Sequence, residues 1–179
     1  MLDISNSVVV IIDIQEKLVA AAGKYSPVEK ACKIAEAAKI LNIPVIVTEQ
    51  YPKGLGATVE ALAEKLPADV VYLEKTAFSA MLTPEFVHSL EKTGRKQVVI
   101  FGIEAHICVY QTICDLIDAG YEVCVVKDAS ASRHKDEFKA GIDLIKQNGA
   151  KVTCTEIVLF EWLRTSKHEN FKSVQALVK

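Results

Sequence analysis

The sequence predicts an α/β fold of three layers, in which a six-stranded parallel sheet lies between two layers of helices. Short apolar runs rich in β-branched residues alternate along the whole chain with segments of helical periodicity. Half of the 179 residues are hydrophobic, which is enough for a sizeable core. The segments between the apolar runs are long enough to hold helices. The strands are therefore expected to run parallel in right-handed βαβ units.

The first half of the chain begins this alternation. Residues 7–13 form a continuous apolar run, typical of a central strand that is buried on both faces. Residues 27–42 place apolar side chains at helical spacing, and Pro27 suits the first turn of that helix. A second strand is expected over residues 44–48. Residues 51–56 are expected to form a loop, because they contain a proline and two glycines.

The second half continues the pattern. Helices are expected at about residues 58–66, from Thr83 and Pro84 onward, over residues 106–119 and over residues 136–148. Further strands are expected over residues 70–73, 97–101, 121–126 and 151–154, and one or two helices end the chain. No linker, repeat or low-complexity segment interrupts this order. A single domain over residues 1–179 is therefore expected.

Composition excludes several classes of protein. The 21 basic and 23 acidic residues give a net charge of -2, so no nucleic-acid partner is expected. The longest apolar run, residues 8–12, is far shorter than the ~18 residues of a membrane span, and the first residues lack a secretory signal pattern. The five cysteines are odd in number and have no CxxC spacing. We expect a cytoplasmic protein with reduced thiols and no membrane partner.

Three residues are candidates for chemistry because a doubly wound sheet binds ligands beyond the carboxyl ends of its strands. Asp13 ends the first strand, Lys75 lies just past the third, and Cys108 lies just past the fourth, near the start of a helix. A thiol in the first helical turn is expected to have a lowered pKa, and a nearby lysine favours the thiolate further. An aspartate can take the thiol proton, and backbone N–H groups before Cys108 can form an oxyanion hole.

Each residue also has an ordinary structural explanation. An aspartate after a strand is often an N-cap, a loop lysine is usually solvated, and a cysteine near a helix start is often core packing. The convergence of all three on one edge favours a catalytic site.

Three segments of the chain resemble the isochorismatase-like (cysteine hydrolase) superfamily. They are Val10-Ile-Ile-Asp-Ile-Gln15, Lys75-Thr-Ala-Phe-Ser79 and Gly102-Ile-Glu-Ala-His-Ile-Cys-Val109. The segment after the second strand looks most like the isochorismatase domain-containing and YcaC-related branch. The resemblance implies the strand order 3-2-1-4-5-6 and a catalytic triad of Cys108, Asp13 and Lys75. It also implies a cis peptide between Ile103 and Glu104, and an oxyanion hole formed by the amides of Glu104 and Cys108.

The resemblance implies a hydrolase that acts on a small C–N, amide-like substrate through a thioester, and a homo-oligomer. Gln15, Tyr51, Phe78 and His106 are expected near the substrate. Nicotinamidases of the superfamily bind a metal through histidines after the second strand, and residues 48–56 contain none. We therefore expect no metal and no cofactor. Isochorismate-cleaving members do not need the cysteine, so that activity is not favoured here.

Two other functions stay open. The first is a catalytically weak or inactive protein that binds a small molecule on the same fold. The second is a redox-responsive protein in which Cys108 or Cys114 is the sensor. Six residues of helix separate these two cysteines by about 9 Å, too far for an unstrained disulfide.

Overall fold

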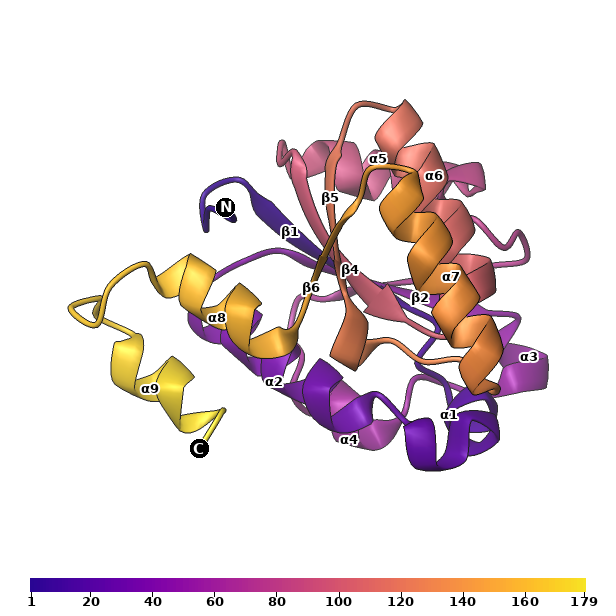
Figure 1. The fold of residues 1–179 in the computed structure, drawn as a ribbon, viewed down its shortest axis with the longest axis horizontal. Helices are drawn as coiled ribbons and strands as arrows, with labels where there is room; N and C mark the ends of the chain where they lie inside the picture. The colour runs from indigo at the N-terminus through magenta and orange to yellow at the C-terminus, as the bar shows by residue number, and fades with distance from the viewer.

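The computed structural model describes residues 1–179 and contains a six-stranded parallel sheet in the order β3-β2-β1-β4-β5-β6 (Figure 1). The strands are β1 (Ser7–Ile12), β2 (Val45–Gln50), β3 (Val71–Lys75), β4 (Gln97–Gly102), β5 (Glu122–Val126) and β6 (Lys151–Thr153). All five strand pairs are parallel. The predicted fold class and strand order are therefore confirmed.

The two central strands are apolar after their first residues, Ser7 and Gln97, and helices cover both of their faces. Every residue of β1 and β4 is buried. Side chains of β1 alternate between the two cores: Val9 and Ile11 join one, and Val8 and Val10 join the other. Successive side chains of a strand point to opposite faces of the sheet, and a layer of helices covers each face.

Helices form a layer on each face of the sheet (Figure 1). One layer contains α2 (Val28–Ile40), α4 (Glu60–Ala63), α8 (Thr155–Leu163) and α9 (Phe171–Ala176). The other contains α5 (Pro84–Lys92), α6 (Tyr110–Asp118) and α7 (Lys135–Gln147). Trp162 of α8 lies in the first core, and its indole N–H donates to Ser7 Oγ at 3.0 Å.

Four segments differ from the expectations drawn from the sequence. A helix that was not predicted, α1 (Glu16–Ala22), follows β1. Residues 51–56, expected as a loop, contain the one-turn helix α3 (Pro52–Leu55), because Pro52 suits a first turn. The helix expected over residues 58–66 is shortened to α4, and Lys75 is the last residue of β3 rather than a loop residue.

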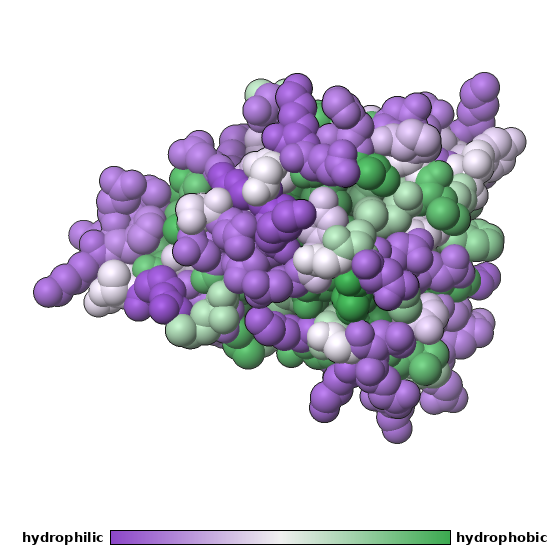
Figure 2. All heavy atoms as spheres, turned by 90° about the horizontal axis from the view of Figure 1, so that it is seen from above, coloured by the Kyte–Doolittle hydropathy of each residue, from purple (hydrophilic) through white to green (hydrophobic).

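No helix of the structure has both the length and the apolar character needed to cross a membrane. Figure 2 looks onto the molecule from above the view of Figure 1. Hydrophilic side chains form most of the rim in that view, and hydrophobic side chains show between them toward the middle.

Candidate active site

Asp13 follows β1 in a left-handed backbone conformation, with φ 51°. Such a φ is uncommon for a residue with a side chain, and Asp tolerates it better than most. The residue is completely buried. Its Oδ1 accepts a hydrogen bond from Thr48 Oγ1 at 2.6 Å, and its Oδ2 lies 2.7 Å from Lys75 Nζ. The turn after β1 therefore holds a carboxylate inside the protein, toward strands β2 and β3.

Lys75 ends β3, and its ammonium group is surrounded by acceptors. Its Nζ lies 2.7 Å from Asp13 Oδ2, 2.7 Å from Gln50 Oε1 and 3.2 Å from each carbonyl oxygen of Ala77 and Phe78. Neither side chain of the Lys75–Asp13 ion pair is exposed. Burial of a charge is costly unless the charge is paired and hydrogen-bonded, and both conditions are met here.

Cys108 lies in a π-helical turn, Ala105–Val109, that joins β4 to α6. The α-helix begins only at Tyr110, so the expected helix over residues 106–119, with Cys108 in its first turn, is wrong at its start. Thr112 Oγ1 donates to Cys108 O at 2.6 Å and accepts from the N–H of Ala80 at 3.0 Å. These bonds join the π-helical turn, residues 105–109, to the segment that follows Lys75.

The pKa of Cys108 departs from the sequence-based expectation. Burial and the negative charge of Asp13 raise the pKa of the Cys108 thiol to about 12, and Lys75 acts in the opposite direction. Cys108 is only 6% exposed. The expected lowering of this pKa is therefore wrong, because desolvation and the adjacent carboxylate outweigh the lysine. Both charges act on this thiol, as charges that are near it do.

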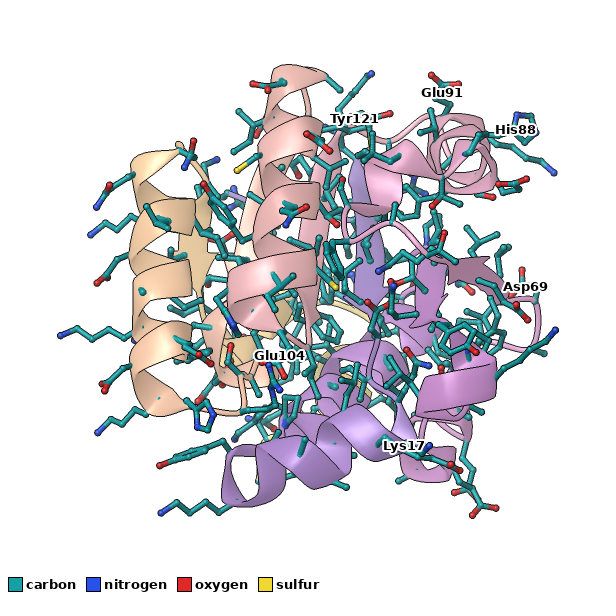
Figure 3. All side chains as sticks on the ribbon, turned by 90° about the vertical axis from the view of Figure 1, so that its right-hand side faces the viewer. Lys17, Asp69, His88, Glu91, Glu104 and Tyr121 are labelled. Carbon is teal, nitrogen blue, oxygen red and sulfur yellow. The ribbon has the colours of Figure 1, made fainter.

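The peptide bond between Ile103 and Glu104 is cis, as the resemblance implied. The backbone N–H of Glu104 donates to no acceptor in the structure. The side-chain carboxylate of Glu104 accepts from the backbone N–H of Arg133 at 3.0 Å and lies 2.9 Å from Arg133 Nε. Figure 3 shows Glu104 near the lower ends of α6 and α7, above α1.

Glycine is required where β4 ends. Gly102 has φ 148°, and a Cβ there would lie 1.9 Å from the carbonyl oxygen of Ile12. No side chain fits this approach between β1 and β4. The close contact brings the segment with Glu104 and Cys108 beside the turn that contains Asp13.

The four residues expected near the substrate lie in different surroundings. Gln15 is fully buried: its Nε2 donates to the carbonyls of Gln50 and Gly56, and its Oε1 accepts from the N–H of Gln50. The side-chain amide of Gln15 therefore links Gln50, before α3, to Gly56, after it. Tyr51, which follows β2, is 57% exposed, and Phe78, which follows β3, is 53% exposed.

His106 lies on the π-helical turn, two residues before Cys108. Its Nδ1 lies 2.9 Å from Ser132 Oγ and 3.6 Å from Glu104 Oε2, and its Nε2 lies 3.5 Å from Glu137 Oε2. The side chain therefore links the turn to the start of α7.

Thr48 and Gln50 belong to the site and were missed in the sequence. Both lie on β2, where Thr48 pairs in register with Ile12 and Gln50 with Lys75. The sequence feature that could have identified them is the change from apolar to polar residues at the end of a buried strand. Which neighbouring strand they face follows only from the strand order.

The region after β2 does not fit a nicotinamidase-type metal site. Glu49 Oε1 accepts hydrogen bonds from the N–H and Oγ1 of Thr58, each at 2.7 Å. No group of three or more His, Cys, Asp or Glu side chains in the structure is arranged to hold a metal ion.

Comparison with known proteins gives a consistent family assignment. The family described as "Isochorismatase domain" matches residues 7–157. Isochorismatase domain-containing protein 2 of Danio rerio is 39% identical over 180 residues, covering 99% of this chain and 89% of that protein. Isochorismatase domain-containing protein 1 of the same species is 39% identical over 148 residues. The chain spans about half of that longer relative, 51% of its length.

Two solved structures share the fold along nearly the whole chain. The MAR1 ribonuclease of Caenorhabditis elegans is 38% identical, with a TM-score of 0.93, and the match covers 99% of this chain and 91% of that one. The YcaC gene product of Escherichia coli, described as an octameric hydrolase of unknown specificity, is 25% identical, with a TM-score of 0.92. That match covers 98% of this chain and 88% of the other.

Proposed function

The chain belongs to the isochorismatase domain family, and from that premise we propose that it is a cysteine hydrolase of a small amide-like substrate. Cys108 is the proposed nucleophile, Asp13 the acid–base, and Lys75 the cation that orients Asp13. The observation that carries the proposal is the buried ion pair of Asp13 and Lys75, 2.7 Å apart, beside a buried thiol. Hydrolysis is the broad activity for which the E. coli relative is described.

The first step transfers the thiol proton. Since the pKa of Cys108 is raised to about 12, the resting thiol is neutral and needs a base as the substrate arrives. Asp13 is the adjacent carboxylate, and it takes the proton while Sγ forms a bond to the carbonyl carbon of the substrate. Lys75 and Thr48, which contact the two oxygens of Asp13, hold that carboxylate in place.

The second step breaks the C–N bond. The oxygen of the tetrahedral intermediate carries a negative charge, and the free N–H of Glu104 is a suitable donor to it, together with the N–H of Cys108. Ammonia or an amine leaves with the proton from Asp13, and a thioester on Cys108 remains. Asp13 then removes a proton from water, which attacks the thioester and releases a carboxylic acid and the thiol.

The residues around the triad give this site its substrate environment. Tyr51 and Phe78 are exposed beside the end of β3, where they can contact an apolar part of a substrate. Gln15 acts through the segment around α3, and His106 acts through the turn that carries Cys108. The last two are therefore positioning residues in this proposal.

The proposal is tested with Cys108→Ala and a matched control, Cys114→Ala, which removes a thiol from the next helix. Release of ammonia from a panel of small primary amides is measured for both variants and for the wild type. We expect Cys108→Ala to lose turnover by about 10³-fold or more, because the covalent step is removed. Cys114→Ala is expected to stay within about twofold of wild type, because this partly buried thiol lies outside the proposed triad.

Mass spectrometry of rapidly quenched wild type is expected to find an acyl group on Cys108 alone. Full turnover by Cys108→Ala would contradict the proposal. Absence of turnover in the wild type, together with saturable binding of an amide, would favour the small-molecule binding protein instead. A buried, neutral thiol is the observation on which that alternative rests.

An RNA substrate is a weaker candidate. The C. elegans relative bears the name ribonuclease. This chain has 21 basic and 23 acidic residues, so it offers no excess of positive charge to a phosphate backbone. RNA is included in the substrate panel for comparison. The octameric assembly is described for the E. coli protein. A homo-oligomer and a cytoplasmic location for this chain stay predictions.

A further inference from the structure

A cavity of about 310 Å³ lies at the carboxyl ends of β5 and β6, apart from the proposed active site. It is lined by Tyr25, Lys127, Asp128, Ser130, Ala131, Ser132, Lys135, Phe138, Thr153 and Cys154. None of Asp13, Lys75 and Cys108 belongs to its lining. Its volume is at the lower end of the range for small-molecule sites. The cavity therefore has the size for a ligand of about one ring.

Two lysines give this cavity a positive charge. Lys127 follows β5, Lys135 begins α7, and neither forms an ion pair in the structure. Asp128 is the one acidic residue of the lining. Its Oδ1 accepts from the N–H and the Oγ1 of Thr155, at 2.8 and 3.0 Å, so that oxygen is committed to the start of α8.

Two helices begin at the cavity: α7 has no side-chain cap, and the first N–H of α8 donates to Asp128 Oδ1. His134 precedes α7 and Cys154 precedes α8, and neither side chain accepts from the helix that follows. The N–H groups of Lys135, Asp136 and Glu137 donate to no acceptor in the structure. In Figure 1 the segment between β5 and α7 lies between the first turns of α8 and α7. The positive end of the α7 dipole therefore adds to the charge of the lysines, while the Asp128 carboxylate offsets that of α8.

The remaining lining is largely apolar. Phe138, one turn into α7, and Tyr25, after α1, contribute aromatic rings, and Ala131 contributes a methyl group. The hydroxyls of Ser130 and Thr153 add polar contacts. A group of positive charges at the rim of an apolar cavity fits a molecule with one anionic group on a compact apolar body.

We propose that this cavity is a second ligand site, which binds a small organic carboxylate with a ring-sized apolar body. The carboxylate lies between Lys127 and Lys135 at the two helix starts, and the apolar body contacts Phe138 and Tyr25. No triad residue lines this site, and its one link to the proposed active site is the contact of Ser132 with His106.

Benzoate is the probe that tests this site, in a titration of ¹⁵N-labelled full-length protein followed by NMR. We expect saturable shifts of the amides of Ala131, Ser132 and Cys154, with a Kd of about 1 mM or tighter. The double variant Lys127→Ala/Lys135→Ala is expected to weaken binding by about tenfold or more, since hydrogen bonds to charged groups are lost. Benzyl alcohol, which has the ring without the charge, is expected to bind more weakly by a similar factor.

The matched control is Lys139→Ala/Lys146→Ala, which removes the same charge from exposed positions of α7 outside the cavity. It is expected to leave the Kd within about twofold of wild type, because solvent and salt screen distant charges. Cys108→Ala is expected to bind benzoate as wild type does. An absence of saturable shifts, equal weakening by both lysine pairs, or shifts centred on the residues around Cys108 would each overturn the proposal.

Discussion

At the scale of single residues, the charge state of Cys108 is set by its neighbours. The thiol is buried among apolar groups and next to a carboxylate, and both raise its pKa. Lys75 opposes them, but its Nζ is also engaged with Asp13 and Gln50. A neutral thiol beside a fixed base stays unreactive toward chance electrophiles until a substrate is bound. The proposed mechanism therefore needs Asp13 as base more than it needs a free thiolate.

Asp13→Asn is expected to lower the pKa of Cys108, because the negative charge that raises it is removed and Lys75 remains. Asn also tolerates the left-handed backbone that Asp13 adopts, but it leaves the buried charge of Lys75 unpaired, so the variant is expected to be less stable by ~3–5 kcal/mol. Lys75→Met is expected to shift the pKa in the opposite direction. The measurement is the ¹³Cβ chemical shift of labelled cysteines against pH, which reports each thiol separately.

Asp128→Asn is the control for this titration, because Asp128 also follows a strand but lies outside the triad. It should leave the pKa of Cys108 unchanged. Asp13→Asn should also lose turnover although its thiol ionises more easily. A pKa that is unchanged or higher in Asp13→Asn would mean that the carboxylate does not act on the thiol.

At the scale of elements, the π-helical turn is the feature that places Cys108. Residues 105–109 precede α6, and α7 packs directly on them. Gly141 of α7 is the contact point: a Cβ there would lie 2.7 Å from Cα and 2.9 Å from Cβ of His106. The turn is therefore held from outside by a helix that comes more than thirty residues later in the chain.

Gly141→Ala is expected to destabilise the protein by ~1–3 kcal/mol, because the added methyl group overlaps the backbone of the turn. Helix propensity alone predicts the reverse, a gain of ~1 kcal/mol. Turnover is expected to fall as well, since the displaced turn carries Cys108. Chemical denaturation measures the free energy of unfolding, and the amide assay measures activity.

Ala140→Gly, at the exposed neighbouring position of α7, is the reference for this helix. It is expected to cost ~1 kcal/mol and to leave turnover unchanged. A Gly141→Ala variant that is more stable than wild type, with full turnover, would mean that the contact with the turn carries no constraint.

The prediction of elements from sequence succeeded where periodicity was strong and failed where packing decides. Strands β1 and β4 were identified because an uninterrupted apolar run has one common explanation. Helix α1 was missed because its seven residues are too few to display a full apolar stripe. The π-helical turn has no signature in the sequence, since it follows from the approach of α7 and from the contact at Gly102.

At the scale of the whole molecule, buried thiols link stability to pH. Burial raises the pKa of Cys108 to about 12, and burial together with Glu161 raises the pKa of Cys124 to about 11. Each ordinary value is 9.0. Above that pH the unfolded chain loses these protons while the folded protein retains them. The stability is therefore fully present below pH ~9 and is lost as pH rises toward the folded values.

The free energy of unfolding of wild type is expected to fall relative to Cys108→Ala by up to ~1.4 kcal/mol per pH unit above pH ~9. The comparison is made by urea denaturation at several pH values between ~8 and ~10.5, so that other titrating groups cancel between the two proteins. Cys32→Ala, which removes a half-buried thiol, is expected to give a smaller effect. Parallel curves for wild type and Cys108→Ala would contradict the raised pKa.

The sequence by itself determined the fold class, the strand order through family resemblance, and which residues stand at the carboxyl edge of the sheet. It could do so because apolar periodicity and chain order decide which face of an element is buried and which strand ends meet. Only the tertiary structure decided the surroundings of those residues. The contacts of Asp13 with Thr48, of Lys75 with Gln50, and of the π-helical turn with α7 join segments far apart in the chain. The same contacts exclude water from Cys108, and for this reason its pKa is raised where its position near a helix start suggested the opposite.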